Sequence, residues 1–481
     1  MKKIFIIGSG FSSISASTYL AKKGHKVTVF EKNSSIGGRA RQFKKDGFTF
    51  DIGPSWYWMP DVFESYFNDF GKQVSDYYKL DKLNPAYEVY FNKLDSVKIG
   101  DSLEKICEEF ERIEPGSGSV LKKFMRKAEK HYEIAVKDMV YKPGISPLEL
   151  VNKKTIVRLK YFLTNIKKEV EKYFKNEKLS QILQFPVLFL GAKPSNTPAF
   201  YNFMNHADFG LGTWHPKKGM YSVIKGMKKL AEEIGVSFKT NQNVEKIIVN
   251  QKSATGIVVN GEEKYCDVII SGADYHHTES LLEEKFRSYN ESYWERKTFA
   301  PSSLLFFVGL NKKIEKVSHH TLFFDVDFDL HASEIYDNPK WPSNPLFYGN
   351  FASITDPSMA PTGKEACFFL VPIAPGISDS EKTREKYFEI IIKRLEKLTN
   401  QSIKDFILFK ESFCVNDFEK EYNSYKGNAY GLANTLKQTA FLRPKMISKK
   451  VKNLYFTGQL TVPGPGVPPS IISGKIVSDL I

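Results

Sequence analysis

The N-terminal sequence KKIFIIGSGFSSISASTYLAKKGHKVTVFEKN follows a strand–turn–helix–strand order that few folds accommodate. Residues 4–7 form a short apolar run typical of a buried strand. Residues 11–21 carry apolar side chains at near-helical spacing, and Gly24 stands where the helix should end. Residues 25–30 form a second apolar run. Two strands joined by one helix predict a parallel βαβ unit of an α/β domain.

The turn after the first strand has the glycines of a dinucleotide-binding fingerprint. Gly8 permits the tight turn, and Gly10 lets the backbone approach a pyrophosphate at the N-terminus of the helix. Ser13 replaces the third glycine, and serine is small enough to be tolerated. Glu31, at the end of the second strand, is expected to accept hydrogen bonds from ribose hydroxyls, which argues against a 2′-phosphate. The alternative is a β–α turn without a ligand.

Two further glycine turns favour one dinucleotide over the others. Gly37-Gly38-Arg39 places a cation beside a flexible backbone shortly after Glu31, and Gly53-Pro54-Ser55 makes another close backbone approach. A nicotinamide enzyme does not need these turns, because its substrate domain lies elsewhere. FAD, bound in an extended form, would run past the pyrophosphate and use them. The sequence therefore predicts FAD.

Composition and cysteines narrow the class of protein. The 481 residues suffice for two or three domains, and 42% hydrophobic and 26% charged residues are ordinary for a globular protein. The four cysteines lie far apart without a CxxC pair, so we expect no disulfide framework and take a reducing cytoplasm as the default. Residues 1–17 outline a signal peptide, but the pattern continues into the predicted helix and second strand. We find no run of eighteen apolar residues that would span a membrane.

The net charge of +14 is concentrated in one segment. Residues 121–178 contain 16 Lys and Arg against 7 Asp and Glu, which is more than half of the excess. A solvated helical surface is the simplest interpretation. An anionic membrane surface is the functional alternative, and no motif for nucleic-acid binding accompanies the charge.

Several patterns resemble metal or catalytic motifs without matching them. Asp325, Asp327 and Asp329 have calcium-loop spacing, but the loop lacks its glycine and its closing glutamate. The pairs His276-His277 and His319-His320 are adjacent rather than one helical turn apart. No GxSxG motif occurs. We predict no bound metal.

The chain resembles the FAD-dependent carotenoid desaturases, in particular the bacterial-type phytoene desaturases. The similarity rests on GSGFSS, EKNSSIGGRARQF, FDIGPSW, WHPKKGMYSVIKGMKKLAEEIGV, VIISGADYHHTESLL, YNSYKGNAYGLANTLKQTAFLRP and NLYFTGQLTVPGPGVPPSIISGK, which cover nearly the whole chain. The last is the most specific, because a rigid Pro/Gly turn between a strand at 454–456 and a final helix exposes bare backbone to a flavin edge. In related flavoproteins an acidic residue often follows the glycine of that strand, and here it is Gln459.

The resemblance implies an α/β fold with a Rossmann-like FAD-binding domain of the flavin amine-oxidase type. It also implies an α+β substrate domain and a helical, basic, membrane-facing subdomain. The FAD domain is predicted to be discontinuous, at 1–80, 215–290 and 420–481, and the substrate domain to occupy 81–214 and 291–419. A helix is expected at 221–234 and a strand pair at 236–250. The predicted FAD-binding residues are Gly8, Gly10, Phe11, Ser12, Glu31, Lys32, Gly38, Arg39, Gly53, Pro54, Ser55, Val244, Gly458, Gln459, Gly466, Val467 and Pro468.

The resemblance also implies a reaction. Phytoene would be desaturated toward lycopene by hydride transfer to flavin N5 and proton loss, and oxygen or a quinone would reoxidise the flavin. A carotenoid 3,4-desaturase and a carotene isomerase are alternatives within the family. A prenyl-lipid carrier of the dissociation-inhibitor type is an alternative of another class. The catalytic residue stays unassigned, with Asp51, His206 and Asp208 as candidates. Aromatic-rich stretches at 54–67, 185–191 and 197–214 are core or the lining of a polyene tunnel.

A long apolar polyene resides in membranes, so we expect peripheral association with the inner face of the cell membrane. The best candidate surface is residues 157–174, predicted as one helix lying in the headgroup plane. Its apolar face would consist of Leu159, Phe162, Ile166, Val170 and Tyr173, flanked by Lys160, Lys167, Lys168 and Lys172. The alternative is that this face packs on the domain beneath.

Overall fold

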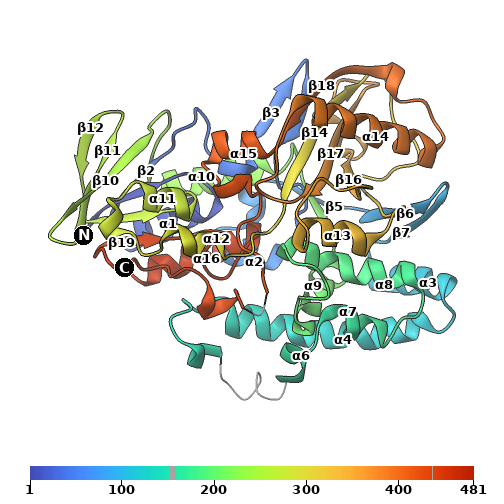
Figure 1. The fold of residues 1–481 in the computed structure, drawn as a ribbon, viewed down its shortest axis with the longest axis horizontal. Helices are drawn as coiled ribbons and strands as arrows, with labels where there is room; N and C mark the ends of the chain where they lie inside the picture. Colours follow the sequence, from blue (N-terminus) through green and yellow to red (C-terminus); the bar gives the residue numbers. More distant parts are fainter. Residues whose placement is uncertain (151–158, 436) are drawn as a thin grey trace.

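A five-stranded parallel sheet draws its strands from distant parts of the chain (Figure 1). The computed structural model describes residues 1–150, 159–435 and 437–481. The strand order is β19-β13-β1-β2-β9, with Ile4 of β1 aligned with both Val27 and Val268. The strands are β1 (Lys3–Ile7), β2 (Lys26–Phe30), β9 (Ser237–Lys239), β13 (Val268–Ser271) and β19 (Leu454–Phe456).

Helices cover this sheet, and the first and last helices of the chain pack closely on each other. These are α1 (Phe11–Lys22) and α16 (Val467–Asp479). A Cβ at Gly474 of α16 would overlap the carbonyl oxygen of Ser12 in α1, so only glycine fits there. The other helices in this part of the molecule are α10 (Tyr221–Glu233), α11 (Tyr275–Ser280) and α2 (Pro60–Asn68).

Ser13 is tolerated at the third fingerprint position because its opposite neighbour has no side chain. A Cβ added to Gly272, at the end of β13, would overlap the Oγ of Ser13. That hydroxyl is buried and has no hydrogen-bond partner among the described residues. The glycine that allows helix and strand to approach has therefore moved from the helix to the strand.

A seven-stranded mixed sheet forms the second layer, with order β18-β14-β17-β16-β15-β6-β7. Helix α14 (Glu381–Thr399) packs on it through Phe388, Ile391 and Leu395. The helix α13 (Phe328–Tyr336) lies at the other side in Figure 1, toward the helical layer. The strands are β6 (Tyr87–Asn92), β7 (Asp95–Ile99), β14 (Ser302–Leu310), β15 (His320–Phe323), β16 (Phe347–Asn350), β17 (Glu365–Ile373) and β18 (Ile407–Phe413).

Helices below this sheet form the third part of the molecule in Figure 1. They are α3 (Leu103–Ile113), α4 (Ser117–Ile134), α6 (Leu159–Leu163), α7 (Ile166–Glu171), α8 (Glu177–Gln184) and α9 (Phe203–Asn205). Smaller sheets complete the fold: β3 (Gln42–Lys45) with β4 (Phe48–Asp51), β5 (Leu80–Lys82) with β8 (Trp214–Pro216), and β10 (Val244–Asn250) with β11 (Ser253–Val259) and β12 (Glu262–Tyr265). The fold also contains two short helices, α12 (Glu291–Glu295) and α15 (Val415–Tyr422).

Two local predictions are wrong. The strands at 237–239 and 244–250 do not pair with each other, because β9 adds to the parallel sheet and β10 starts a separate antiparallel sheet. The predicted helix at 157–174 is interrupted at Asn165, whose side chain caps α7 by accepting a hydrogen bond from the amide of Lys168 (2.9 Å). Residues 157 and 158 lie outside the described residues.

The apolar face predicted for membrane contact is turned inward. Ile166 and Val170 are fully buried in the main core, and Phe162 stacks on Phe200 with ring centroids 4.6 Å apart. The neighbouring lysines are also partly engaged: Lys167 pairs with Asp329 and Lys172 with Glu169. The side chain of Leu159 lies outside the described residues, and the rest of this face packs on the domain rather than facing a bilayer.

Within the described residues, the structure contains no helix that is both long and apolar enough to cross a membrane.

Substitutions can test the close contact between Ser13 and Gly272. Gly272→Ala should lower the free energy of unfolding by about 1–3 kcal/mol, because its methyl group overlaps the serine hydroxyl. In a Ser13→Ala background the same substitution should be nearly neutral. Thermal unfolding of the two single variants and the double variant measures this coupling. Additive losses would contradict the proposed contact.

Candidate cofactor and substrate site

One continuous cavity of about 450 Å³ runs between the parallel sheet and the seven-stranded sheet. Its walls include every residue that the sequence predicts for FAD binding, from Gly8 and Glu31 to Val467 and Pro468. Residues that lie hundreds of positions apart, such as Gly38, Val244 and Gly458, meet there. Their role in binding is a proposal, whereas their convergence on one cavity is a property of the fold.

Glu31 holds the glycine turn in place from the end of β2. Its carboxylate accepts hydrogen bonds from the backbone amide of Ser9 (3.1 Å) and from the Ser9 hydroxyl (2.6 Å). It also accepts one from the amide of Asn33 (2.9 Å). The carboxylate is thereby fixed at the cavity wall, where ribose hydroxyls of a bound dinucleotide could compete for it.

Arg39 supplies the cation of the predicted site. Its guanidinium donates to the Ser424 hydroxyl (2.9 Å) and to the Asn428 carbonyl oxygen (3.2 Å), and lies over the Tyr422 ring. Its Nε is buried and has no hydrogen-bond partner among the described residues. Burial lowers the pKa of Arg39, and the carboxylate of Asp274 partly opposes this shift. A partly buried cation whose buried Nε is an unused donor fits an anionic ligand such as a pyrophosphate.

The glycines of the cavity divide into two kinds. At Gly53 an added Cβ would overlap the carbonyl oxygen of Arg39, so glycine is required by the protein itself. At Gly10 the backbone has φ −72°, and no described atom lies within 4 Å of an added Cβ. Gly10 therefore leaves open space at the N-terminus of α1, where a bound pyrophosphate can approach the backbone.

The C-terminal Pro/Gly turn is held by a buried arginine that the sequence analysis missed. Arg443 donates to the carbonyl oxygens of Thr461 (2.8 Å), Gln459 (2.8 Å) and Leu432 (3.2 Å). It also donates to the Asn434 side chain (2.7 Å). Burial lowers the pKa of Arg443 to about 10, so the side chain stays charged at neutral pH. The available signal was a lone arginine in FLRP within a motif of the resemblance.

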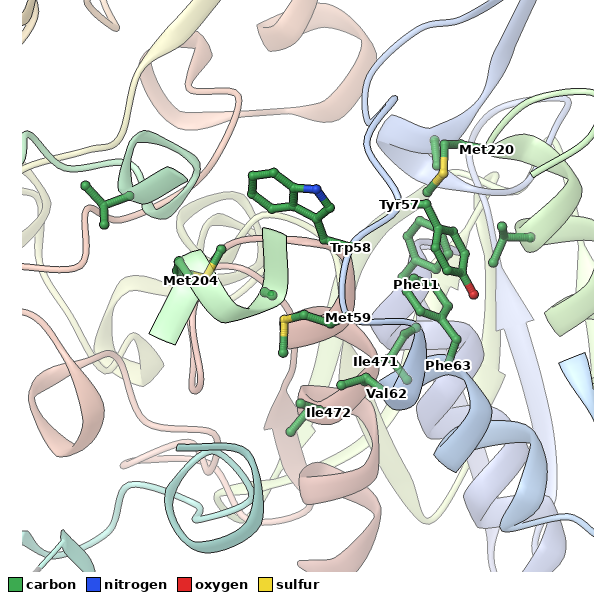
Figure 2. Close-up of a cluster of buried hydrophobic side chains, with 14 of the residues drawn as sticks. Phe11, Tyr57, Trp58, Met59, Val62, Phe63, Met204, Met220, Ile471 and Ile472 are labelled. Carbon is green, nitrogen blue, oxygen red and sulfur yellow. The ribbon is translucent and has the colours of Figure 1, made fainter. Parts of the chain in front are cut away.

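The other end of the cavity is apolar and aromatic. Tyr57 and Trp58 point in opposite directions from one extended segment, Tyr57 toward Phe11 and Trp58 toward Met204 (Figure 2). Trp58, Met59 and Met204 line the cavity, whereas Tyr57 is fully buried in the core. The aromatic-rich stretches thus contribute both to the cavity wall and to the hydrophobic core. Further apolar lining residues are Trp56, Phe185, Leu188, Leu305, Leu322, Phe324, Phe328, Ile335, Leu346, Phe347 and Leu370.

None of the three acid/base candidates lines the cavity. Asp51 accepts hydrogen bonds from the amides of Met220 (2.7 Å) and Tyr221 (3.2 Å) at the start of α10, and burial raises its pKa to about 6. Asp208 accepts one from the Tyr87 hydroxyl (2.8 Å), and burial raises its pKa. Burial lowers the pKa of His206. Asp51 has the role of a helix cap.

Polar residues of the second sheet reach the cavity instead. The Tyr348 hydroxyl lies 3.0 Å from the Ser55 hydroxyl and 2.6 Å from Nδ1 of His320. Ser55 and Tyr348 both line the cavity. Sequence reasoning missed Tyr348 because nothing in its local sequence distinguishes it from other strand tyrosines.

The aspartates with calcium-loop spacing have other partners. Asp325 pairs with Arg394, Asp327 caps α13 by accepting from the Leu330 amide (2.9 Å), and Asp329 pairs with Lys167. In the part of the chain that the structure describes, no group of His, Cys, Asp and Glu side chains is arranged to hold a metal ion.

Comparison with known proteins decides the family. The model of the flavin-containing amine oxidoreductases matches residues 12–481. A carotenoid 3,4-desaturase of Haloarcula japonica is 40% identical over 99% of this chain and 97% of its own length. The chain is a carotenoid desaturase family member. A 4,4′-diapophytoene desaturase of Staphylococcus haemolyticus is 32% identical, over 99% of this chain and 98% of its own.

Solved structures share the fold at much lower identity. An oxidoreductase from Methanosarcina mazei has a TM-score of 0.65 at 16% identity, covering 99% of this chain and 100% of its own. A Rab GDI from Plasmodium falciparum has a TM-score of 0.57 at 13% identity, covering 99% and 97%. The predicted α/β fold of the flavin amine-oxidase type is confirmed. The same fold occurs in a dissociation inhibitor, so the fold alone does not distinguish an enzyme from a carrier.

The protein is thus an FAD-dependent oxidoreductase that acts on carotenoids. The cavity fits the cofactor, since it combines the unused donor of Arg39, the open backbone at Gly10 and the carboxylate of Glu31. When bound, FAD supplies the oxidant that accepts a hydride from carbon. The protein supplies orientation, and an apolar chamber that excludes water beside it.

Gly10 offers a clean test of the cofactor site. Gly10→Val should abolish copurification of flavin, because the side chain fills the space for the pyrophosphate, while the fold tolerates it. Glu31→Ala should weaken flavin retention. Flavin absorbance per protein measures both effects, and far-ultraviolet circular dichroism checks the fold. Full flavin content in both variants would show that the site is misplaced.

Proposed function

We propose that the enzyme introduces a double bond at carbons 3 and 4 of an already conjugated carotenoid. The observation that carries this proposal is the 40% identity to a carotenoid 3,4-desaturase along nearly the whole of both chains, against 32% to a diapophytoene desaturase. The continuous cavity supports it, because an apolar chain in the aromatic half can place one carbon pair beside the cofactor half.

Desaturation of phytoene toward lycopene is the second candidate. It rests on the motifs shared with phytoene desaturases and on the similarity to the diapophytoene desaturases. Isomerisation with reduced FAD is a third reading within the family. Neither is favoured by a feature of the cavity, so the identities of the relatives decide the order.

Pigment analysis separates these candidates. We expect the gene to leave phytoene unchanged in a host that accumulates it. In a host that accumulates lycopene it should remove two hydrogens for each 3,4 double bond formed and lengthen the chromophore. Absorption spectra and masses of the extracted pigments give the number of hydrogens removed. Conversion of phytoene to lycopene would overturn the 3,4-desaturase assignment, and a product of unchanged mass would indicate isomerisation. The Gly10→Val variant is the matched control.

The electron acceptor and the membrane are parts of the same proposal. The reduced flavin passes its electrons to oxygen or a quinone, and the enzyme takes its substrate from the inner face of the cell membrane. The buried face of α7 cannot serve this contact. We place the contact at three exposed side chains on either side of residues 151–158: Ile145 (58% exposed), Leu148 (75%) and Leu163 (76%).

We call Ile145, Leu148 and Leu163 the docking surface. The segment that carries Ile145 and Leu148 adjoins the C-terminal Pro/Gly turn at residues 461–470. The segments that carry the docking surface lie at the lower edge of the view in Figure 1. The backbone at Gly144 packs against Val462, and Lys445 donates to the Gly144 carbonyl oxygen (2.7 Å). Apolar side chains at this edge can enter the headgroup region, and Lys160 can contact anionic lipid.

Replacement of the exposed leucines tests the docking surface. Leu148→Glu with Leu163→Glu should reduce cosedimentation with anionic liposomes at least several-fold, because the transfer of two apolar side chains and the attraction to anionic lipid are both lost. Flavin content and thermal stability should stay unchanged. Leu408→Glu, at a side chain 47% exposed on β18, is the matched control. Equal binding of all variants would place the contact elsewhere.

A further inference from the structure

A row of three buried histidines leads from the cavity to the protein surface. His320 and His319 have ring centroids 4.4 Å apart, and His319 and His215 have ring centroids 4.6 Å apart. All three side chains are buried, with at most 3% exposed. We call His320, His319 and His215 the imidazole row.

The inner end of the row touches the cavity wall. The His320 ring stacks on Trp56, with centroids 4.1 Å apart, and its Nδ1 lies 2.6 Å from the Tyr348 hydroxyl. The Asn350 amide nitrogen, which can only donate, also reaches Nδ1 (3.2 Å). Nδ1 is therefore an acceptor, and the neutral ring carries its proton on Nε2. Ser55, Trp56 and Tyr348 line the cavity itself.

The outer end of the row reaches one surface loop by two routes. Nδ1 of His319 is hydrogen-bonded to the hydroxyl of Thr355, an exposed residue. Nε2 of His215 lies 3.1 Å from the Asp356 carboxylate, which also accepts from the exposed Ser358 hydroxyl (2.6 Å). Although burial opposes it, the hydrogen bonds from His215 and Ser358 hold the pKa of Asp356 well below its usual range.

The middle of the row is chemically unfinished. Nε2 of His320 and Nε2 of His319 are both buried, and neither has a hydrogen-bond partner among the described residues. Burial lowers the pKa of both rings well below the ordinary value, and neighbouring histidines add to this shift. Two adjacent neutral imidazoles with unused nitrogens are costly for stability alone, and a ring rotation that brings these nitrogens within hydrogen-bond distance would let a proton pass between them.

We propose that the imidazole row carries the proton released by desaturation from the cavity to loop 354–358. This inference rests on the proposed desaturation. When FAD is bound, it would accept one hydrogen of the substrate as hydride, with the electron pair of the C–H bond that breaks. The neighbouring C–H bond breaks, its electron pair forms the new double bond, and its proton needs an acceptor.

The residues give that proton a path. The Tyr348 oxygen accepts it while the tyrosine proton moves to Nδ1 of His320. No hydrogen bond joins the two rings among the described residues, so His320 must turn before it can release a proton to His319. His319 then passes a proton to Thr355 along their hydrogen bond, or, after a similar turn, to His215 and Asp356. No charge accumulates on Tyr348, and the proton reaches water at the exposed loop. The carboxylate of Asp51 also interacts electrostatically with His215, at the outer end of the row.

Chemical rescue distinguishes a relay from simple packing. Anaerobic mixing with carotenoid should bleach the flavin of the holoenzyme, and His319→Gly should slow this about 10²-fold, the lower range for general acid–base groups. Imidazole in the buffer should restore much of the rate. 1-Methylimidazole fills the same space but cannot take up a proton on one nitrogen and release one from the other, so it should not. His25→Asn, at a partly buried histidine that does not line the cavity, is the control.

An unchanged rate in His319→Gly, equal rescue by both imidazoles, or no rescue by either would overturn the relay. If no carotenoid bleaches the flavin of the unaltered enzyme, the proposed function itself is wrong.

A measurement without substrate reports on the row independently. Because His319 and His320 stay neutral when folded, the unfolded chain binds more protons below pH about 6.5, and stability falls as pH drops below that value. The thermal midpoint of flavin-free protein should fall less with acid in the His319→Asn and His320→Asn variants than in the parent. Parallel acid dependence in all three would show that folding does not lower the pKa of either ring, which would contradict two buried neutral imidazoles at the centre of the row.

Discussion

The rest of the structure depends on one constraint: backbone without side chains must come into close contact where the first strand, the first helix and the last helix meet. Gly8 adopts φ +84° against Ala273, Gly272 faces Ser13, and Gly474 faces Ser12. Any side chain at Gly272 or Gly474 would separate the elements. Because they touch, the N-terminus of α1 opens directly into the cavity, with its unpaired amides available to an anion.

The second consequence concerns charge. Arg443 is buried and Arg39 is partly buried, and in the described structure their hydrogen bonds go to neutral oxygens rather than to carboxylates. A buried cation without a counterion is unfavourable unless a ligand or several dipoles compensate it. Arg443 uses backbone dipoles and thereby fixes the C-terminal Pro/Gly turn. Arg39 keeps a free Nε beside the glycine turns, which suits a bound phosphate group.

The two halves of the cavity have different chemical characters, which suit the two ligands of a desaturase. The half beside the parallel sheet offers glycine turns and Arg39, and the half beside the seven-stranded sheet offers aromatic and aliphatic walls. Tyr348 stands where they meet, bonded to Ser55 on one side and to His320 on the other. A hydrophobic substrate is thereby held in a site from which a proton can still leave.

The sequence by itself determined the parts that depend on local chemistry. Strand, turn and helix at 3–30 follow from glycines and hydrophobic spacing. Most of the residues predicted for FAD binding lie in or beside glycine turns that the sequence shows, although their convergence on one cavity is a property of the fold. Three kinds of feature depended on tertiary structure. Residues 157–174 carry an amphipathic pattern that fits a bilayer or a core equally well, and only packing on Phe200 decided for the core. Asp51 is an acidic residue at the end of a strand. In the fold it lies beside the start of α10, where it caps the helix by accepting a hydrogen bond from the Met220 amide. His215 lies more than a hundred residues from His319, so their stacking could not be read from spacing. Local pattern fixes backbone conformation, whereas burial, partners and proton paths are set by contacts between distant segments.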